Sequence, residues 1–297
     1  MPEPGKIKIL FIINSAAGNK TTDWPTLIKN YFAPLNYIIE FFILQQDCNI
    51  QTIQEKINQF NPQQVVAVGG DGTIKLVAEC LIQKNIAIGI LPAGSANGLA
   101  KELGISDKPE EALHILTNGV LKKIHVTRVN NHLCVHLSDI GFNAFLIKKF
   151  ETQKRRGMWG YLKASLKVLI KHPRMQVEME IDKKTVKMNA AMIVIANATK
   201  YGSGAVINPV GKLDDLLFEV IVIKKISLHE IYKMTFSHAP IDPAKTEIFQ
   251  TNALKMRSVR RAHFQVDGEY LGKVNEVNAS IITEALEMIV PGTDTNV

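Results

Sequence analysis

Apolar segments of strand length alternate with segments of helical spacing through about the first 125 residues, and this order most restricts the folds open to the chain. The strand-like segments lie at 8–13, 37–44, 65–68 and 86–91, with helical patterns between them, for example at 49–60 and 73–83. Parallel strands need long crossover connections, which are usually helices. The alternation therefore predicts an N-terminal α/β domain built on a parallel sheet.

Two helix starts in this region are marked by an acidic residue close to a proline. Thr22 and Asp23 precede Pro25, and Asp107 precedes Pro109. A side-chain oxygen at the cap and a proline in the first turn are typical of helix N-termini. We expect one helix to begin at Asp23 and its neighbours, and Asp107 to cap another.

Three polar or glycine-rich turns follow the predicted strands, at 14–18, 69–73 and 92–97. In open parallel sheets, ligands bind beyond the carboxyl ends of the strands. We therefore expect these turns to meet at one rim and to form a nucleotide site.

The sequence after about residue 130 is rich in strand-like segments instead. Examples are 132–138, 176–181, 186–196 and 218–223. This texture favours a second domain with an antiparallel sheet. We place the domains at 1–128 and 129–297, with the residues after about 284 as a segment that could pack back onto the first domain.

The strongest single motif is the turn Gly69-Gly70-Asp71-Gly72-Thr73, which stands between an apolar strand and a helix. Glycines allow the backbone N–H groups to approach phosphate oxygens, and the helix N-terminus favours negative charge. Asp71 would be poised to act on a metal ion or a phosphate. The alternative is an ordinary glycine turn with an aspartate cap.

A second turn of small residues ends the next strand, at Pro92-Ala93-Gly94-Ser95-Ala96-Asn97-Gly98. Small residues permit close approach of a nucleotide, and the Ser95 hydroxyl and Asn97 amide can form hydrogen bonds. A simple tight turn is the alternative here. Asn14, in the turn after the first strand, completes the set of candidate nucleotide contacts.

These two turns, about twenty residues apart, together with Asp267-Gly268-Glu269 resemble the signature of the diacylglycerol kinase, sphingosine kinase and bacterial lipid kinase family. The resemblance covers nearly the whole chain and includes 14–18, 139–144 and 197–209. It implies an α/β nucleotide-binding domain like that of NAD kinases and diacylglycerol kinases, a β-sandwich-like second domain, and ATP and Mg²⁺ as cofactors.

The resemblance also implies roles for individual residues. Glu269 matches the family's catalytic base, and Asp71 would complete the metal network. A carboxylate suits the first role because it can accept the proton of the substrate hydroxyl. A magnesium site in the second domain falls on Lys212, Asp215 and Leu217, where oxygen ligands suit a hard cation.

Composition restricts the cellular setting. Three widely spaced cysteines and the lack of an apolar run near 20 residues favour a cytoplasmic protein that does not cross a membrane. The net charge of +7 favours anionic partners. Lys148 to Arg174, with nine basic residues and one acidic, could dock on an anionic membrane surface, although a solvated basic helix face is the commoner cause.

We therefore expect an ATP- and Mg²⁺-dependent lipid kinase, with diacylglycerol as the leading substrate and a homodimer as one possible state. Three alternatives remain. One is a kinase for a polar substrate, above all NAD kinase. Another is a regulatory protein without turnover, motivated by Gly98 and Leu216, where the family has Asp and usually Gly. The least favoured is a nucleic acid binding protein, because no known nucleic acid motif accompanies the charge.

Overall fold

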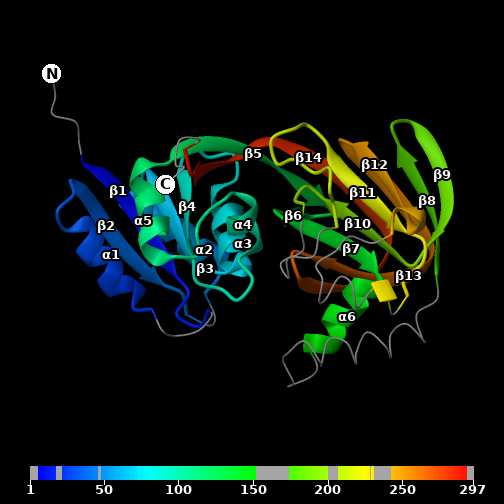
Figure 1. The fold of residues 1–297 in the computed structure, drawn as a ribbon, viewed down its shortest axis with the longest axis horizontal. Coiled ribbons are helices and arrows are strands. Elements are labelled where there is room, and N and C mark those ends of the chain that lie inside the picture. The colour runs from blue at the N-terminus through cyan, green and yellow to red at the C-terminus, as the bar shows by residue number, and fades with distance from the viewer. Residues whose placement is uncertain are drawn as a thin grey trace. The chain divides into compact units, whose positions relative to one another are not determined.

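The computed structural model describes residues 6–17, 22–45, 48–151, 174–199, 207–227, 229–230 and 242–292 (Figure 1). The chain divides into two compact units, which are described separately. Unit 1 comprises Met1–Ile124 and Glu284–Val297, and unit 2 comprises His125–Thr283.

Unit 1 is an α/β unit with a parallel sheet in the order β2-β1-β3-β4. Its strands are β1 (Ile7–Ile13), β2 (Tyr37–Ile43), β3 (Gln64–Gly69) and β4 (Ala87–Pro92). Its helices are α1 (Trp24–Phe32), α2 (Ile50–Phe60), α3 (Asp71–Leu81), α4 (Gly98–Glu102) and α5 (Pro109–Asn118). The predicted α/β class of the N-terminal domain is confirmed.

The core of unit 1 explains why its strands read as continuous apolar runs. Val65, Val66 and Val68 of β3 are fully buried, as expected for a strand covered on both faces. Asp23 accepts the backbone N–H of Thr26 and caps α1, as predicted.

The last strand, β14 (Glu269–Val290), contributes its end to unit 1. Met288 pairs in parallel with Ile88 of β4, and the N–H of Gln83 donates to the carbonyl of Ala285 at 2.8 Å. The strand β5 (Val120–Val129) likewise begins in unit 1 and ends in unit 2. The units are thus linked by two strands of the chain.

Unit 2 is built from antiparallel strands in the order β12-β11-β10-β7-β13, with β8 paired to β13 and β9 to β8. Its elements are β6 (His132–Cys134), β7 (Leu137–Gly141), α6 (Phe142–Glu151), β8 (Met175–Ile181), β9 (Lys184–Ala190), β10 (Met192–Ala196), β11 (Phe218–Ile223), the 3₁₀ helix η2 (Pro243–Lys245), β12 (Thr246–Thr251) and β13 (Ala253–Val266). Strand β10 has a core on each face: Ile193 and Ile195 belong to one, and Met192 and Val194 to the other.

Two of the predicted strand segments are interrupted. Residues 186–196 divide at Ala191 into β9 and β10, where its carbonyl accepts the N–H of Phe142 at 3.2 Å. Residues 132–138 divide into β6 and β7 at Val135 and His136, whose N–H groups donate to the carboxylate of Asp267. In both cases a partner distant in sequence interrupts the regular pairing.

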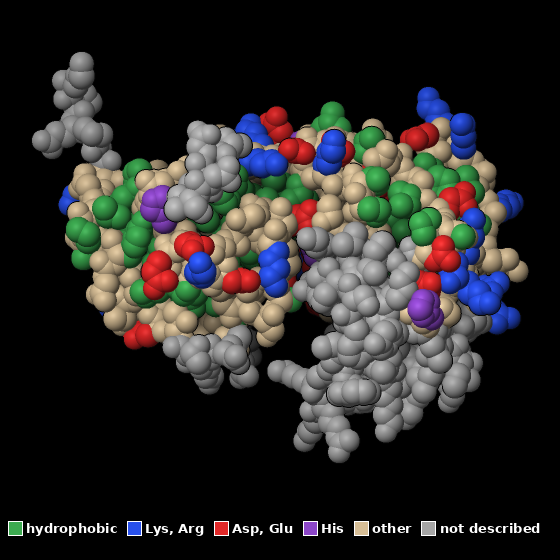
Figure 2. Space-filling model, viewed as in Figure 1, with side chains coloured by type: hydrophobic (Ala, Val, Ile, Leu, Met, Phe, Trp, Pro, Cys, Tyr) green, Lys and Arg blue, Asp and Glu red, His purple; other side chains and the backbone are tan. Residues whose placement is uncertain are grey.

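The described surface carries hydrophobic, acidic and basic side chains interspersed, and Figure 2 shows Lys and Arg side chains on the edge of unit 2 formed by β8 and β9. Within the described part of the chain, no helix is both long and apolar enough to span a bilayer.

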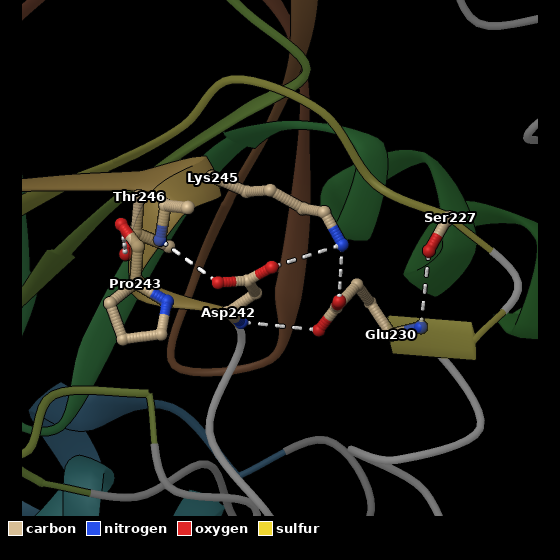
Figure 3. Close-up of polar contacts among 7 residues, drawn as sticks. Ser227, Glu230, Asp242, Pro243, Lys245 and Thr246 are labelled. Atoms are coloured by element: carbon tan, nitrogen blue, oxygen red, sulfur yellow. Dashed lines mark hydrogen bonds and ion pairs between the residues drawn. The ribbon is translucent and has the colours of Figure 1, made fainter.

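An ion pair between a buried glutamate and a partly exposed lysine lies beside η2 (Figure 3). Glu230 has a side chain only 2% exposed, and its carboxylate accepts the Lys245 ammonium at 2.6 Å and the N–H of Asp242 at 3.2 Å. The hydrogen bond to Glu230 raises the pKa of Lys245 above its ordinary value. This pair joins two segments that are apart in sequence, so it should stabilise unit 2.

We expect Glu230→Gln to lower the thermal midpoint by about 2–4 °C. Lys245→Met should lower it further, because it removes a cation from beside the buried Glu230 carboxylate. The matched control is Lys224→Met, which removes the same charge from an exposed pair with Glu247. Calorimetry on the three variants checks this; equal effects of Lys245→Met and Lys224→Met would contradict it.

Candidate active site

The turns after β3 and β4 touch backbone to backbone. A Cβ atom added to Gly94 would lie 2.4 Å from the Cα of Gly70, and one added to Gly70 would lie 3.1 Å from the Cα of Gly94. The N–H of Ala93 donates to the carbonyl of Gly69 at 2.9 Å. Both glycines are therefore required by close approach, and the two predicted turns meet at one rim.

Asp71 fastens this contact. It lies in the first turn of α3, and its two carboxylate oxygens accept the N–H groups of Gly98 and Leu99, each at 3.0 Å. These donors open α4, so one side chain joins the starts of two helices, where a negative charge is favourable. The expected role of Asp71 toward a metal stays a prediction.

Asn97 closes the second turn on itself. It adopts a left-handed conformation with φ of 52°, which asparagine tolerates better than most residues. Its Oδ1 accepts the N–H of Gly94 at 2.9 Å, and its Nδ2 donates to Asp107 at 3.1 Å. The prediction that Asp107 caps the next helix is wrong: α5 starts after Lys108, which forms no side-chain cap bond.

The first turn joins the same rim through Asn14. Its Nδ2 donates to the hydroxyl of Thr73 at 3.2 Å, and its Oδ1 accepts the N–H of Ala16 at 3.1 Å. Thr73 also leaves no room for a side chain at position 69, since a Cβ atom added to Gly69 would lie 2.3 Å from the Thr73 hydroxyl oxygen.

Gly72 differs from its neighbours because no atom of the described residues lies within 4 Å of the Cβ that it lacks. It sits inside α3, where alanine would be the better helix former. The described protein atoms therefore give no reason for a glycine at this position.

A cavity of about 770 Å³ opens beside the rim, within unit 1. Four predicted contacts line it, namely Asn14, Gly94, Ser95 and Asn97, whereas the residues 69–73 are not among its lining residues. Sequence reasoning missed other members of the lining, including Thr22, Asp23, Trp24 and Lys101. They come from the start of α1 and from α4, and only their place in the fold brings them to the rim. The volume is in the range of nucleotide-sized pockets.

In unit 2, Asp267 and Gly268 form the two-residue turn between β13 and β14. Both residues have positive φ, 49° and 85°, and Val266 pairs with Glu269 across the turn. These are the features of a type I′ hairpin, in which an Asp-Gly pair is strongly preferred. Glu269 is exposed at the first position of β14.

Asp267 anchors this hairpin. Its carboxylate accepts the N–H groups of Val135, His136 and Leu137, at 3.0, 2.9 and 3.2 Å. Its own N–H donates to the carbonyl of Leu137 at 2.9 Å. Three donors around one carboxylate fix the turn, and with it Glu269, against the start of β7. The sequence contained this residue in its motif but gave no sign of its partner.

A buried polar network continues behind the turn. Gln265 accepts the N–H of Gly268 at 2.7 Å and donates to the carboxylate of Asp139 at 2.6 Å. Asn143 donates to the same carboxylate oxygen at 2.6 Å. The hairpin is therefore tied to β7 and to the first turn of α6. Asp71 belongs to unit 1 and Glu269 to unit 2, and each is positioned within its own unit by these contacts.

The candidate magnesium loop is exposed, with Lys212 at its start and Leu216 58% exposed. Asp215 turns back so that its Oδ1 accepts the N–H of Leu217 at 3.2 Å. Among the described residues, no group of three or more His, Cys, Asp and Glu could hold a metal. A cation here would therefore depend on backbone carbonyl oxygens beside the one carboxylate.

Residues next to this loop are compatible with such a cation. Gly211 has no room for a Cβ, which would lie 2.2 Å from the Nδ2 of Asn208. The Oδ1 of Asn208 is buried and has no hydrogen-bond partner among the described residues, and its Nδ2 donates to Glu219 at 2.5 Å. Burial raises the pKa of Glu219, and the charge of Asp215 adds to this. The surroundings are thus rich in oxygen atoms, as a hard cation prefers.

Comparison with known proteins relates both units to one family. Residues 8–129 match the model of the diacylglycerol kinase catalytic domain, and residues 139–290 match that of the YegS C-terminal NAD kinase beta sandwich-like domain. A diacylglycerol kinase of Bacillus subtilis is 26% identical over 220 residues, which cover 70% of this chain and 71% of that protein. An uncharacterised protein of Synechocystis is 26% identical over 303 residues, covering 94% of this chain and 69% of that one.

The fold is also that of a solved structure. The crystal structure of a diacylglycerol kinase from Bacillus anthracis superposes with a TM-score of 0.74, at 16% identity, covering 97% of this chain and 98% of that one. At this identity the likeness shows the fold alone. The α/β unit followed by a β-sandwich-like unit is thereby confirmed.

We expect Asp267→Asn to lower the stability of the fold by about 2 kcal/mol, because an amide has one acceptor oxygen for three N–H donors. The same change should loosen the turn that bears Glu269. Chemical denaturation measures the first effect. The matched control is Asp23→Asn, whose exposed carboxylate caps α1 by accepting the N–H and the hydroxyl of Thr26. An Asp267→Asn midpoint equal to that of the control would refute the anchoring role.

Proposed function

The chain belongs to the diacylglycerol kinase family and is a lipid kinase. We propose that it transfers the γ-phosphate of ATP, with Mg²⁺, to the hydroxyl of diacylglycerol. The observation that carries this proposal is the contact of Gly70 with Gly94, held by Asp71, beside a cavity of nucleotide size. The product would be phosphatidic acid.

ATP fits unit 1 on both size and chemistry. The cavity offers the Asn14 and Asn97 amides, the Ser95 hydroxyl and the Lys101 ammonium, which can bind the polar parts of a nucleotide. The phosphates are proposed to lie over the start of α3, where backbone N–H groups and the helix dipole favour negative charge. A glycine at position 72 then has a reason, because a phosphate would occupy the open space beside it.

Glu269 is proposed as the general base. Its carboxylate accepts the proton of the lipid hydroxyl as the hydroxyl oxygen forms a bond to the γ-phosphorus, while the bond to the leaving ADP oxygen breaks. The type I′ turn and the Asp267 anchor would hold the carboxylate in place during this step.

Magnesium would be held in unit 2 by the Asp215 carboxylate and the carbonyl oxygens of Lys212 and Leu217. When bound, such an ion supplies positive charge close to the site and stabilises the loop that carries it. Asp71 is proposed to contribute to the metal network as well. Its carboxylate oxygens retain acceptor capacity beyond the N–H groups of Gly98 and Leu99.

Diacylglycerol lies in membranes, so the enzyme must act at a bilayer surface, and we assign it to the cytoplasmic side. Docking through residues 148–174 stays a prediction, because 152–173 lie outside the described residues. A homodimer likewise stays a prediction.

The direct test is transfer of labelled γ-phosphate from ATP, with Mg²⁺, to a panel of lipids in mixed micelles. NAD and a sample without acceptor run beside it. Labelled phosphatidic acid is expected. Label on NAD would favour a kinase for polar substrates, and no label anywhere would favour a regulatory protein without turnover.

Glu269→Gln should lower kcat by a factor of about 10² to 10⁴, because the amide cannot accept the proton. ATP affinity should stay within about twofold, since the groups proposed to bind ATP belong to unit 1 and Glu269 is proposed to contact the lipid hydroxyl. Steady-state kinetics and calorimetric titration with ATP measure the two quantities. The matched control is Glu276→Gln on the same strand; wild-type turnover in Glu269→Gln would exclude the assigned base.

Gly72→Ala should leave the thermal midpoint unchanged or slightly higher, because its Cβ meets no protein atom and alanine favours the helix. It should nevertheless raise the KM for ATP about tenfold or more, since the methyl group would occupy the phosphate position. Gly94→Ala provides the contrast and should lower the midpoint by the clash with Gly70. Unchanged ATP kinetics in Gly72→Ala would contradict the phosphate placement.

A further inference from the structure

The strand β13 carries a large bulge in its pairing with β14. Arg257 pairs with Glu276 of β14 and Ala262 pairs with Val274, so residues 258–261 stand opposite the single residue Asn275. The Ser258 hydroxyl bridges the bulge by donating to the carbonyl of Arg260 at 2.8 Å. Bulges of this kind redirect side chains and are frequent near functional sites.

The bulge presents an apolar tip flanked by cations. Val259 is 76% exposed, the largest value among the exposed large hydrophobic residues. Arg260 and Arg261 follow it on the exposed side. The guanidinium of Arg261 donates twice to the carbonyl of Lys273, at 3.1 and 2.6 Å, so its position is fixed.

These residues border a cavity of about 610 Å³ within unit 2. Its described lining includes four cations, Arg174, Arg260, Arg261 and Lys273, and no acidic residue. The amides of Gln176 and Asn189 add hydrogen-bond donors. The floor is ordered by His263, which stacks on Phe145 at 4.4 Å and shares a hydrogen bond of 2.7 Å with the Tyr270 hydroxyl.

The described lining of this cavity is positively charged. Among the described residues, none of its four cations forms a salt bridge, whereas Arg257 on the same strand pairs with Glu276 and Lys187 on β9 pairs with Glu178. Four like charges around one cavity repel one another, which costs stability and favours an anionic occupant. A phosphate group, with several acceptor oxygens, is the anion that clustered arginines bind best.

We propose that this basic bulge, comprising Val259, Arg260, Arg261, Arg174 and Lys273, binds the phosphate of anionic phospholipid headgroups and seats unit 2 on the bilayer. Val259 enters the interface between headgroups and acyl chains, while the cations contact the headgroups. The inference rests on the proposed function, because a kinase whose lipid substrate lies in a membrane must bind to the membrane surface.

The test compares sedimentation of the full chain with neutral phosphatidylcholine vesicles and with vesicles that also contain phosphatidylglycerol. The double variant Arg260→Ala/Lys273→Ala removes two cations whose side chains make no described ion pair. It should bind the anionic vesicles about thirtyfold more weakly than the wild type, as expected for two surface charges. The matched control, Lys255→Ala/Lys184→Ala, removes the same charge from exposed positions outside the cavity and should bind as the wild type does.

Three outcomes would overturn the proposal. The first is equal vesicle binding by the double variant and the wild type, and the second is equal binding of the wild type to neutral and anionic vesicles. The third is that the wild type binds soluble glycerol phosphate or short DNA, and that the double variant loses this binding but still binds vesicles as the wild type does. Activity on short-chain diacylglycerol in neutral micelles keeps this test separate from the proposed function. Wild type and double variant should be equally active there. Absence of activity in both would refute the kinase assignment and leave the vesicle result standing.

Discussion

The architecture of unit 1 depends on one contact between two backbones. Gly70 and Gly94 approach so closely that neither can carry a side chain, and this brings the ends of β3 and β4 together. The Asp71 carboxylate then joins the start of α3 to the start of α4. Asn97 and Thr73 add bonds on either side, to Gly94 and Asn14. The rim is therefore rigid before any ligand arrives, which reduces the entropy cost of ordering a flexible nucleotide.

The strands of unit 1 and the turns that end them could be predicted, because each depends on residues close together in the sequence. The strands of unit 1 are continuous apolar runs, and the turns that end them have compositions restricted by close backbone approach. Asp107 was misassigned because an acidic residue before a proline suits a helix cap equally well in sequence, and only the fold shows that Asn97 is its partner. The interruptions at Ala191 and Val135 escaped prediction for the same reason: their partners, Phe142 and Asp267, are remote in sequence.

In the candidate catalytic hairpin, the sequence motif predicts the turn, and only the structure shows the contacts that fix it. Asp267-Gly268 announces a tight turn on its own, since both positions need positive φ. Nothing local indicates that the Asp267 carboxylate gathers three N–H groups from 135–137, or that Gln265 and Asp139 support the turn from behind. Contacts with residues more than a hundred positions away in the sequence fix this surface turn, and so they fix the position of Glu269. Hydrogen bonds between residues so far apart in sequence produce no pattern that can be recognised in the sequence.

The path of β14 has a consequence for how the protein is made. This strand supplies the neighbour of β4 in unit 1, where Met288 pairs with Ile88, yet its end is synthesised only after unit 2. Until then β4 has an open hydrogen-bonding edge, and unpaired edges invite association with other chains. Unit 1 thus cannot complete its sheet until the end of β14 has been synthesised, although most of its sequence comes first. Native folding of the nucleotide-binding half must wait for the whole of unit 2 to be synthesised, so the order of assembly runs opposite to the order of the chain.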